Sequence, residues 1–342
     1  MTVVGVTAWG LTLAQLFAYA DASVCMLART EEEAELVRRR RTEPRRIAEV
    51  RLPPAVEITD APGQALAGAT IIVLVAPAQS MRANLQRIAP AVPSGCVVVS
   101  AAKGIEIGTG LRMTELVAEM LPAAGDRCSI SGPNLAGEIA RGLPAAAVVA
   151  GPAEGALRVQ RALTSPGFRV YTHDDIVGVE IGGALKNIVA LAAGICDGLG
   201  SGDNAKAGII TRGLAEITRL GVALGANPLT FAGLSGVGDV IATCASPLSR
   251  NRRVGEDLGR GRPLGAILAQ LDHVAEGVTT TSATCALARR LGVEMPITFG
   301  MDRVLRGEIT AEEGARLLME REPRGELDSP LNQNPHTAET GP

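Results

Sequence analysis

One lysine in the C-terminal half of the sequence stands in a setting that suits proton transfer. If the segment around Lys186 is helical, Gly182 lies one turn before it and Ala190 one turn after it, on the same face. A face of small residues lets a ligand or another domain approach closely, and burial there lowers the pKa of an amine. Such an amine can protonate a developing alkoxide and accept the proton in the reverse reaction. A lysine that reaches past small neighbours into solvent is an equally good interpretation of these residues alone.

A carboxylate later in the chain could complete this proton-transfer site. Asp239 ends the glycine-rich stretch 234–239, whose backbone can pass close to a ligand. Beside Lys186, it would orient the ammonium group and could hydrogen-bond a substrate hydroxyl. Asp239 could instead, or at the same time, cap the helix that follows it.

The segment that contains Ser249, Arg250 and Asn251 has the chemistry of a phosphate clamp. An arginine binds phosphate through two parallel hydrogen bonds, and a helix that begins nearby adds backbone N–H donors. Arg252 and Arg253 fit a simpler interpretation, the exposed basic face of that helix. The sequence therefore predicts that Arg250 and Asn251 hold a phosphorylated substrate.

The first ten residues resemble a dinucleotide-binding loop. Gly5 and Gly10 occupy the first and third glycine positions of the fingerprint, between a strand pattern and a helix pattern, but Thr7 occupies the second. In such a loop, backbone N–H groups and the helix N-terminus hold the pyrophosphate. The Thr7 β-carbon could crowd that group, whereas its hydroxyl could donate a hydrogen bond to it. Taken alone, the loop also fits a strand-to-helix turn without a ligand.

Cofactor preference is set at the end of the second predicted strand. Sites that prefer NAD place Asp or Glu there, where it binds the ribose 2′-hydroxyl. This chain has Arg29 instead, and the planar guanidinium of arginine suits a 2′-phosphate. The sequence therefore predicts NADP(H), with NAD(H) as a second cofactor. The alternative is a surface arginine that pairs with one of the glutamates 31–33.

These residues need a framework, and the first half of the chain predicts one. Short runs rich in Val and Ile alternate with helical segments, an order typical of a doubly wound, parallel, Rossmann-like α/β sheet. Lys103 follows one predicted strand, at the edge where open α/β sheets bind ligands. The predicted strands are 2–6, 23–28, 70–76, 96–101, 127–131, 143–150 and 167–172.

The second half predicts helices and no strands. We expect a Rossmann-like domain over 1–175, an all-α substrate domain over 176–325, and a disordered polar tail over 326–342. Thr310 and Glu313 have the spacing of a capping box for the last helix. The predicted helices are 9–20, one that begins near 31, 176–197, 204–224, 264–271, 279–291 and 311–319.

Composition excludes several classes of protein. Of the 342 residues, 46% are hydrophobic, so most of the chain should fold, but aromatic residues are only 2%, too few for single-stranded nucleic-acid binding. A net charge of −3 recruits neither nucleic acid nor an anionic membrane. The six cysteines and three histidines have no spacing that indicates disulfides or a metal site. With no leader pattern and no uninterrupted apolar stretch of about 20 residues, a cytoplasmic protein without a membrane span is predicted.

Seven segments together resemble bacterial NAD(P)-dependent glycerol-3-phosphate dehydrogenase. They follow the order and spacing of that family from residue 1 to about 305. The segments are SAAKGIE (100–106), SGPNLAGEIA (131–140), GVEIGGALKN (178–187), GLGSGDNAK (198–206), GVGD (236–239), SRNRR (249–253) and VAEG (274–277).

The resemblance implies a role for each matching residue. Lys186 would be the proton acceptor in alcohol oxidation, with Asp239 beside it. Family members often have Ser or Thr at Asn134 and Ser at Ala8, and Trp9 could equally be a helix-packing residue. The implied substrate positions are Lys103, Gly132, Asn134, Lys186, Asn187, Asp239, Ser249, Arg250 and Asn251. The implied cofactor positions are Gly5, Thr7, Ala8, Trp9, Gly10, Arg29, Lys103, Ala136, Arg250, Val274 and Glu276.

The resemblance also implies a reaction, the reversible reduction of dihydroxyacetone phosphate to sn-glycerol 3-phosphate, without a metal. Its product would supply glycerophospholipid synthesis, and a homodimer is compatible with it. Two alternatives stay open at this point. One is a related two-domain reductase of another ketone or β-hydroxy acid, and the other is a non-catalytic NADP-binding protein, which Thr7 would favour.

Overall fold

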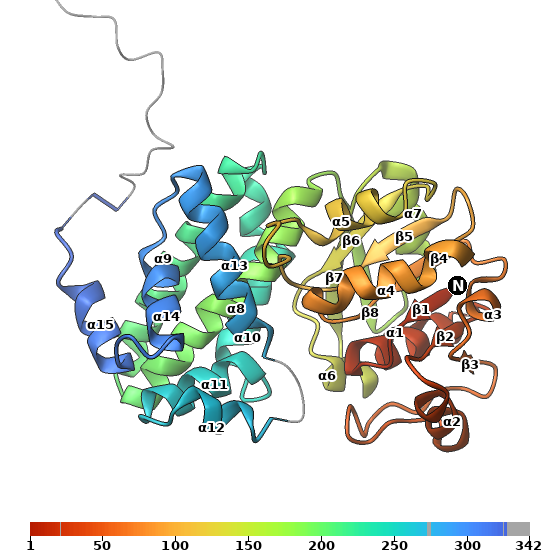
Figure 1. The fold of residues 1–342 in the computed structure, drawn as a ribbon, viewed down its shortest axis with the longest axis horizontal. Coiled ribbons are helices and arrows are strands. Elements are labelled where there is room, and N and C mark those ends of the chain that lie inside the picture. The colour runs from red at the N-terminus through yellow and green to blue at the C-terminus, as the bar shows by residue number, and fades with distance from the viewer. Residues whose placement is uncertain (21, 272–274, 324, 327–342) are drawn as a thin grey trace, which may run out of the picture.

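The computed structural model describes residues 1–20, 22–271, 275–323 and 325–326. Two halves lie side by side, one built around a sheet and the other helical (Figure 1). The sheet has eight strands in the order β3-β2-β1-β4-β5-β6-β7-β8. The strands are β1 (Thr2–Val4), β2 (Cys25–Leu27), β3 (Glu57–Thr59), β4 (Ile71–Leu74), β5 (Val97–Ser100), β6 (Arg127–Ser131), β7 (Ala145–Ala150) and β8 (Phe168–His173).

The sheet confirms the predicted Rossmann-like fold class and corrects two details. All seven predicted strands are present, but β3 was missed, since only three residues, Glu57–Thr59, pair there. The prediction of a wholly parallel sheet was wrong at one place, because β7 runs antiparallel to β6. After β6, the chain turns back through the short helix α6 (Ala136–Ala140) rather than crossing over the sheet.

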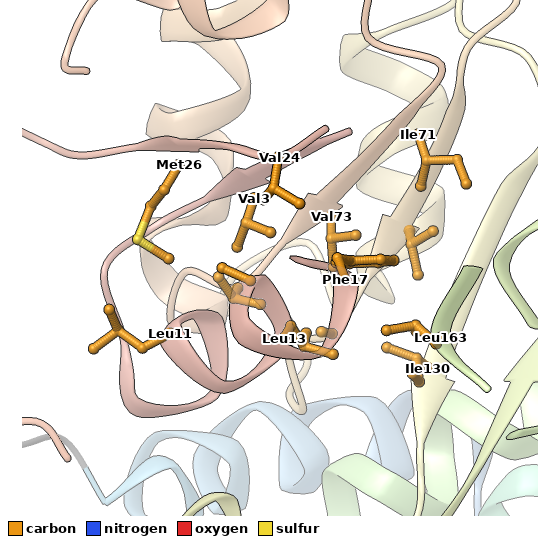
Figure 2. Close-up of a cluster of buried hydrophobic side chains, with 14 of the residues drawn as sticks. Val3, Leu11, Leu13, Phe17, Val24, Met26, Ile71, Val73, Ile130 and Leu163 are labelled. Carbon is orange, nitrogen blue, oxygen red and sulfur yellow. The ribbon is translucent and has the colours of Figure 1, made fainter. Parts of the chain in front are cut away.

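Helices cover both faces of the sheet. Because side chains alternate along a strand, neighbouring residues such as Val3 and Val4 enter different cores. Figure 2 shows part of the first core, where Val3, Val73 and Ile130 of the sheet lie around Phe17. That core includes α1 (Ala8–Tyr19), α2 (Glu31–Arg40), α6 and α7 (Ala153–Leu163), and the other includes α3 (Pro62–Leu66), α4 (Met81–Ile88) and α5 (Met113–Met120).

The helical half is organised around one long helix, α8 (Ile176–Leu199). The Asp175 carboxylate caps its N-terminus by accepting the Gly178 N–H at 2.8 Å, and Gly200, with φ 66°, ends it in the left-handed conformation. Around it lie α9 (Gly202–Ala223), α10 (Asp239–Ala245), α11 (Arg250–Gly259), α12 (Leu264–Leu268), α13 (Glu276–Leu291), α14 (Pro296–Leu305) and α15 (Ala311–Met319).

Most of these helices were predicted, and the capping box of α15 is present, since Thr310 and Glu313 exchange hydrogen bonds of 2.7 and 3.1 Å. As expected, no uninterrupted apolar stretch of about 20 residues occurs in α8, because Glu180, Lys186 and Asp197 interrupt it. By length and mean hydropathy, 1.6, the helix could still pass as a membrane span. Because 89% of that stretch is buried inside the protein, α8 is the core helix of its half. The predicted tail lies outside the described residues, apart from residue 326.

Close packing of α8 against α11 fixes the geometry of the helical half. Each helix carries two glycines four residues apart, Gly194 and Gly198 on α8 and Gly255 and Gly259 on α11. A β-carbon on any of them would collide with a main-chain oxygen of the other helix, so the two backbones touch directly. The oxygens that face these glycines belong, in the same order, to Arg252, Glu256, Leu191 and Ile195.

We expect Gly255→Ala to destabilise the protein by about 1–3 kcal/mol, because the added methyl group must push α11 away from α8. Gly208→Ala is the matched control, since a β-carbon there meets no atom within 4 Å and α9 should be stabilised slightly. Urea unfolding of both variants measures the difference. Equal midpoints for the two would contradict the packing argument.

Candidate active site

Lys186 lies where the two halves of the chain meet. It is buried in α8, and its Nζ donates to Asp239 Oδ1 at the start of α10 and to Thr243 Oγ1 at 2.7 Å. The predicted small face is real, but the protein itself packs against it. A β-carbon on Gly182 would meet the carbonyl of Ser235 at 2.6 Å, so the 234–238 turn η4 (Leu234–Gly238) fills that space. The interpretation of Lys186 as a solvent-exposed lysine is therefore wrong.

Asp239 connects Lys186 to the sheet domain. Its second oxygen, Oδ2, accepts a hydrogen bond of 2.6 Å from Lys103 Nζ, in the loop that follows β5. Lys103 also donates to the carbonyl of Gly132 at 2.9 Å, just after β6. Asp239 is 1% exposed and bridges two lysines from different halves. It is the first residue of α10 and makes no capping bond, so the interpretation of Asp239 as a helix cap does not hold.

Thr243 is a site residue that the sequence analysis missed. It lies one turn after Asp239 on the same face of α10, and it is buried. Its hydroxyl accepts from Lys186 and donates to the main-chain oxygen of Asp239 at 2.6 Å, so it helps to aim the amine. The spacing of four residues in a helix was the available signal.

Burial lowers the pKa of Lys186 from 10.5 to about 8. The negative charge of Asp239 opposes this shift by stabilising the ammonium form, and the positive charge of Lys103 adds to it. An amine with a pKa near 8 exchanges protons readily at physiological pH, which is what a general acid and base requires. The chain has only three lysines, and each forms an ion pair. Lys206, the third, pairs with Asp197, which lies three turns after Lys186 on α8.

Unpaired polar atoms line the sheet side of the same region. Among the described residues, both side-chain polar atoms of Asn134 are buried without a hydrogen-bond partner, and so is Ser131 Oγ. Ser131 faces Gly183 of α8, where a β-carbon would collide with its hydroxyl and approach the Lys103 side chain. Since buried polar groups in proteins are normally paired, Asn134 is a candidate for binding a polar ligand.

The predicted phosphate clamp is only partly free to bind. Asn251 Nδ2 donates to Asn187 Oδ1 at 2.9 Å, and Asn251 Oδ1 accepts the Gly277 N–H at 3.0 Å, so its amide ties α8, α11 and α13 together. Ser249 Oγ caps α11 by accepting the Arg252 N–H at 3.3 Å. Arg252 itself pairs with Asp197 at 2.7 Å, as a structural residue would.

Arg250 is the part of the clamp that points outward. It is the first residue of α11 and is exposed, next to backbone N–H groups that have no acceptor within the helix. Its charge acts on Glu276, the first residue of α13. Burial raises the pKa of Glu276, and Arg250 partly offsets this. Val274, a predicted cofactor position, lies outside the described residues.

The loop after β1 can hold a dinucleotide despite Thr7. Gly5 has φ 116°, a conformation that favours glycine, and a β-carbon on Gly10 would collide with the Gly5 carbonyl. Thr7 adopts extended backbone and caps α1, since its hydroxyl accepts the Gly10 N–H at 3.0 Å. The N–H groups of Ala8 and Trp9, at the first turn, have no acceptor in the helix. These features fit the pyrophosphate of NAD(P).

The remaining predicted cofactor residues are distributed along the same edge. Ala136 begins α6, and its carbonyl accepts a long hydrogen bond of 3.5 Å from Thr12 of α1. The Trp9 ring packs edge-on against Phe168, with 6.2 Å between ring centroids, which favours the packing interpretation for that side chain. Arg29 is mostly exposed and pairs with Glu33 at 2.9 Å, the alternative foreseen from the sequence.

A second buried ion pair docks the two halves. Glu180 of α8 accepts from Arg112 Nη1 at 2.6 Å, and from the N–H and hydroxyl of Thr114 at 2.9 and 2.6 Å. These three residues form a closed network at the start of α5. Together with the bond between Lys103 and Asp239, it holds α8 against the carboxyl edge of the sheet.

A dinucleotide-type loop at one edge of a doubly wound sheet, and a buried amine–carboxylate pair where a helical domain meets that edge, define a two-domain nicotinamide-dependent oxidoreductase. Family models agree. Residues 1–156 match the NAD-dependent glycerol-3-phosphate dehydrogenase N-terminus, and residues 175–316 match the C-terminus of the same family. The chain belongs to the NAD-dependent glycerol-3-phosphate dehydrogenase family.

Individual relatives support this membership. The chain is 48% identical over 328 residues to glycerol-3-phosphate dehydrogenase [NAD(P)+] 2 of Mycobacterium tuberculosis, covering 95% of this chain and 98% of the relative. It is 45% identical to the glycerol-3-phosphate dehydrogenase [NAD(P)+] of Dehalococcoides mccartyi, covering 95% and 92%. A crystal structure of glycerol-3-phosphate dehydrogenase from Coxiella burnetii has a TM-score of 0.90 at 32% identity, covering 94% and 98%.

Proposed function

We propose that this enzyme reduces dihydroxyacetone phosphate reversibly to sn-glycerol 3-phosphate, with Lys186 as the general acid and base. When bound, the nicotinamide cofactor supplies or receives the hydride. The observation that carries the proposal is the buried Lys186 Nζ, held by Asp239 and Thr243 where the two halves meet. In reduction, Lys186 donates a proton to the oxygen of the former carbonyl group, and in oxidation it accepts that proton.

The surrounding residues orient the substrate and the amine. Arg250, with the first N–H groups of α11, binds the substrate phosphate, while the Asn187–Asn251 pair holds that helix end beside Lys186. Asn134 supplies its unpaired amide to a substrate oxygen. Lys103 holds the Asp239 carboxylate in place from the other half of the chain, by donating a hydrogen bond of 2.6 Å to Oδ2.

The cofactor preference belongs to the proposal. We infer that NADP(H) is preferred over NAD(H), because Arg29 rather than an acidic residue follows β2. On binding a 2′-phosphate, the exposed Arg29 would exchange its surface pair with Glu33 for a doubly charged partner. We also propose that the enzyme works in the cytoplasm as a homodimer and that its product supplies glycerophospholipid synthesis.

Steady-state oxidation of NADPH and NADH by the purified protein tests the proposed function. With dihydroxyacetone phosphate we expect turnover, and a higher kcat/KM for NADPH than for NADH. Unphosphorylated dihydroxyacetone is the matched control, and its kcat/KM should be lower by about a thousandfold, because the phosphate interactions stabilise the transition state. Equal rates with the two ketones would contradict the role of Arg250 and of the α11 N-terminus.

A further inference from the structure

A second arginine lies at the end of β2, but it comes from a helix remote in sequence. Arg87 belongs to α4, on the opposite face of the sheet from α2. Its Nη2 donates to the carbonyl of Ala28 at 2.9 Å and to the carbonyl of Asp60. Ala28 follows β2 directly and precedes Arg29, and Asp60 follows β3 directly. The guanidinium is therefore fixed at the carboxyl edge of β2 and β3, beside the peptide that leads into Arg29.

The charge of Arg87 is not neutralised within the part of the chain that the structure describes. Both hydrogen bonds of its guanidinium go from Nη2 to neutral carbonyls, and no carboxylate of the described residues lies within ion-pair distance of it. Arg82, on the same helix, shows the contrast, because it pairs with Glu106 at 2.8 Å and Glu119 at 2.5 Å. Arg87 is half-buried, and the N–H groups of its Nε and Nη1 have no protein acceptor among the described residues.

We propose that Arg87 is a specificity-determining residue that binds the 2′-phosphate of NADP(H) together with Arg29. In doubly wound sheets, the ribose of the adenosine lies at the carboxyl end of the second strand. Arg29 follows that strand in this chain, and Arg87 binds the Ala28 carbonyl there. The charge of Arg29 is partly neutralised by its ion pair with Glu33. Arg87 has no such ion pair among the described residues, and some of its N–H donors are free to bind a phosphate. The inference rests on the proposed placement of the adenosine end at this edge.

Arg87 and Arg29 play different parts in this site. Two main-chain carbonyls hold the guanidinium of Arg87 before any ligand arrives, so little side-chain entropy is lost on binding. Arg29 is mostly exposed and has to leave Glu33. We therefore expect Arg87 to contribute at least as much as Arg29 to the discrimination between NADP(H) and NAD(H).

Calorimetric titration of the full chain with adenosine 2′,5′-bisphosphate and with 5′-AMP tests this, since the two ligands differ only by the 2′-phosphate. For Arg87→Gln we expect the affinity for the bisphosphate to fall about ten- to a hundredfold, and the affinity for 5′-AMP to change less than about twofold. Arg158→Gln is the matched control, because Arg158 is a half-buried arginine that also donates to a main-chain carbonyl, that of Thr70, at the opposite edge of the sheet. It should change neither affinity.

Every other result of this titration contradicts the inference about Arg87. If Arg87→Gln weakens both ligands equally, Arg87 only supports the loops or the adenine, and the inference fails. If Arg29→Ala loses the preference for the bisphosphate and Arg87→Gln keeps it, the inference fails while the cofactor placement stands. If both variants keep it, the 2′-phosphate lies elsewhere. Should Arg87→Gln not fold, Arg87→Lys, which keeps the charge but not the planar donors, is expected to lose about three- to tenfold for the bisphosphate alone.

Discussion

Lys186→Ala is expected to lower turnover by about 10²–10⁴ while leaving NADPH affinity nearly unchanged, because it removes the proposed proton donor without touching the cofactor loop. Lys186→Ala should still fold, because Asp239 keeps its ion pair with Lys103 and is not left as an unpaired buried carboxylate. Stopped-flow measurement of NADPH oxidation at saturating dihydroxyacetone phosphate gives the turnover, and fluorescence titration gives the affinity.

The matched control is Lys206→Ala, which removes another lysine that pairs with an aspartate, Asp197, three turns after Lys186 on α8. It should leave turnover unchanged. If Lys186→Ala were as active as Lys206→Ala, the proton would have to come from another group, and the assignment of Lys186 would be wrong. Lys186→Met, which fills the same space without an amine, should be as slow as Lys186→Ala.

Asp239→Asn should alter the pH dependence as well as the rate. Asp239 raises the pKa of Lys186 against the effect of burial, so its neutralisation moves that pKa further below about 8. Reduction needs the ammonium form, and its rate falls as the pH rises through the pKa of Lys186. In Asp239→Asn this fall should begin at lower pH. Turnover at the optimum should drop about a hundredfold, because an asparagine cannot accept hydrogen bonds from both lysines through two oxygens.

The pH profile separates catalysis from a purely structural effect. Loss of stability alone would lower the rate at every pH without moving the descending limb. Asp257→Asn is the control, because Asp257, in the last turn of α11, pairs with Arg262, which follows that helix. Its profile should match that of the unaltered enzyme. If the rate of Asp239→Asn fell at the same pH as that of the unaltered enzyme, Asp239 would not raise the pKa of Lys186, and this prediction would be wrong.

The sequence predicted the architecture well where the pattern is periodic and long. Runs of Val and Ile located β4 and β5, and the helical pattern located α8 to within two residues of its C-terminus. It missed β3, because three residues such as Glu57–Thr59 show no period. The reversal of β7 was also missed, since a strand pattern contains no direction.

The site was predictable in its residue types but not in its contacts. Resemblance and residue chemistry pointed to Lys186 and Asp239, and the structure brings them together. The bond from Lys103 to Asp239 joins residues 136 positions apart, and only the docking of the two halves creates it. Asn251 was expected to bind phosphate, and the sequence did not indicate that its amide also joins helices, through one bond to Asn187 and one from Gly277. One N–H of Nδ2 stays available for a phosphate oxygen.

The scarcity of lysine opens a spectroscopic route to this enzyme. Reductive methylation with ¹³C-formaldehyde labels amines and leaves arginine untouched, so only the N-terminus and the three lysines would carry signals. Two of the three report directly on the active site, since Lys103 and Lys186 share one carboxylate. An uncrowded NMR titration could thus follow the proton on Lys186 itself.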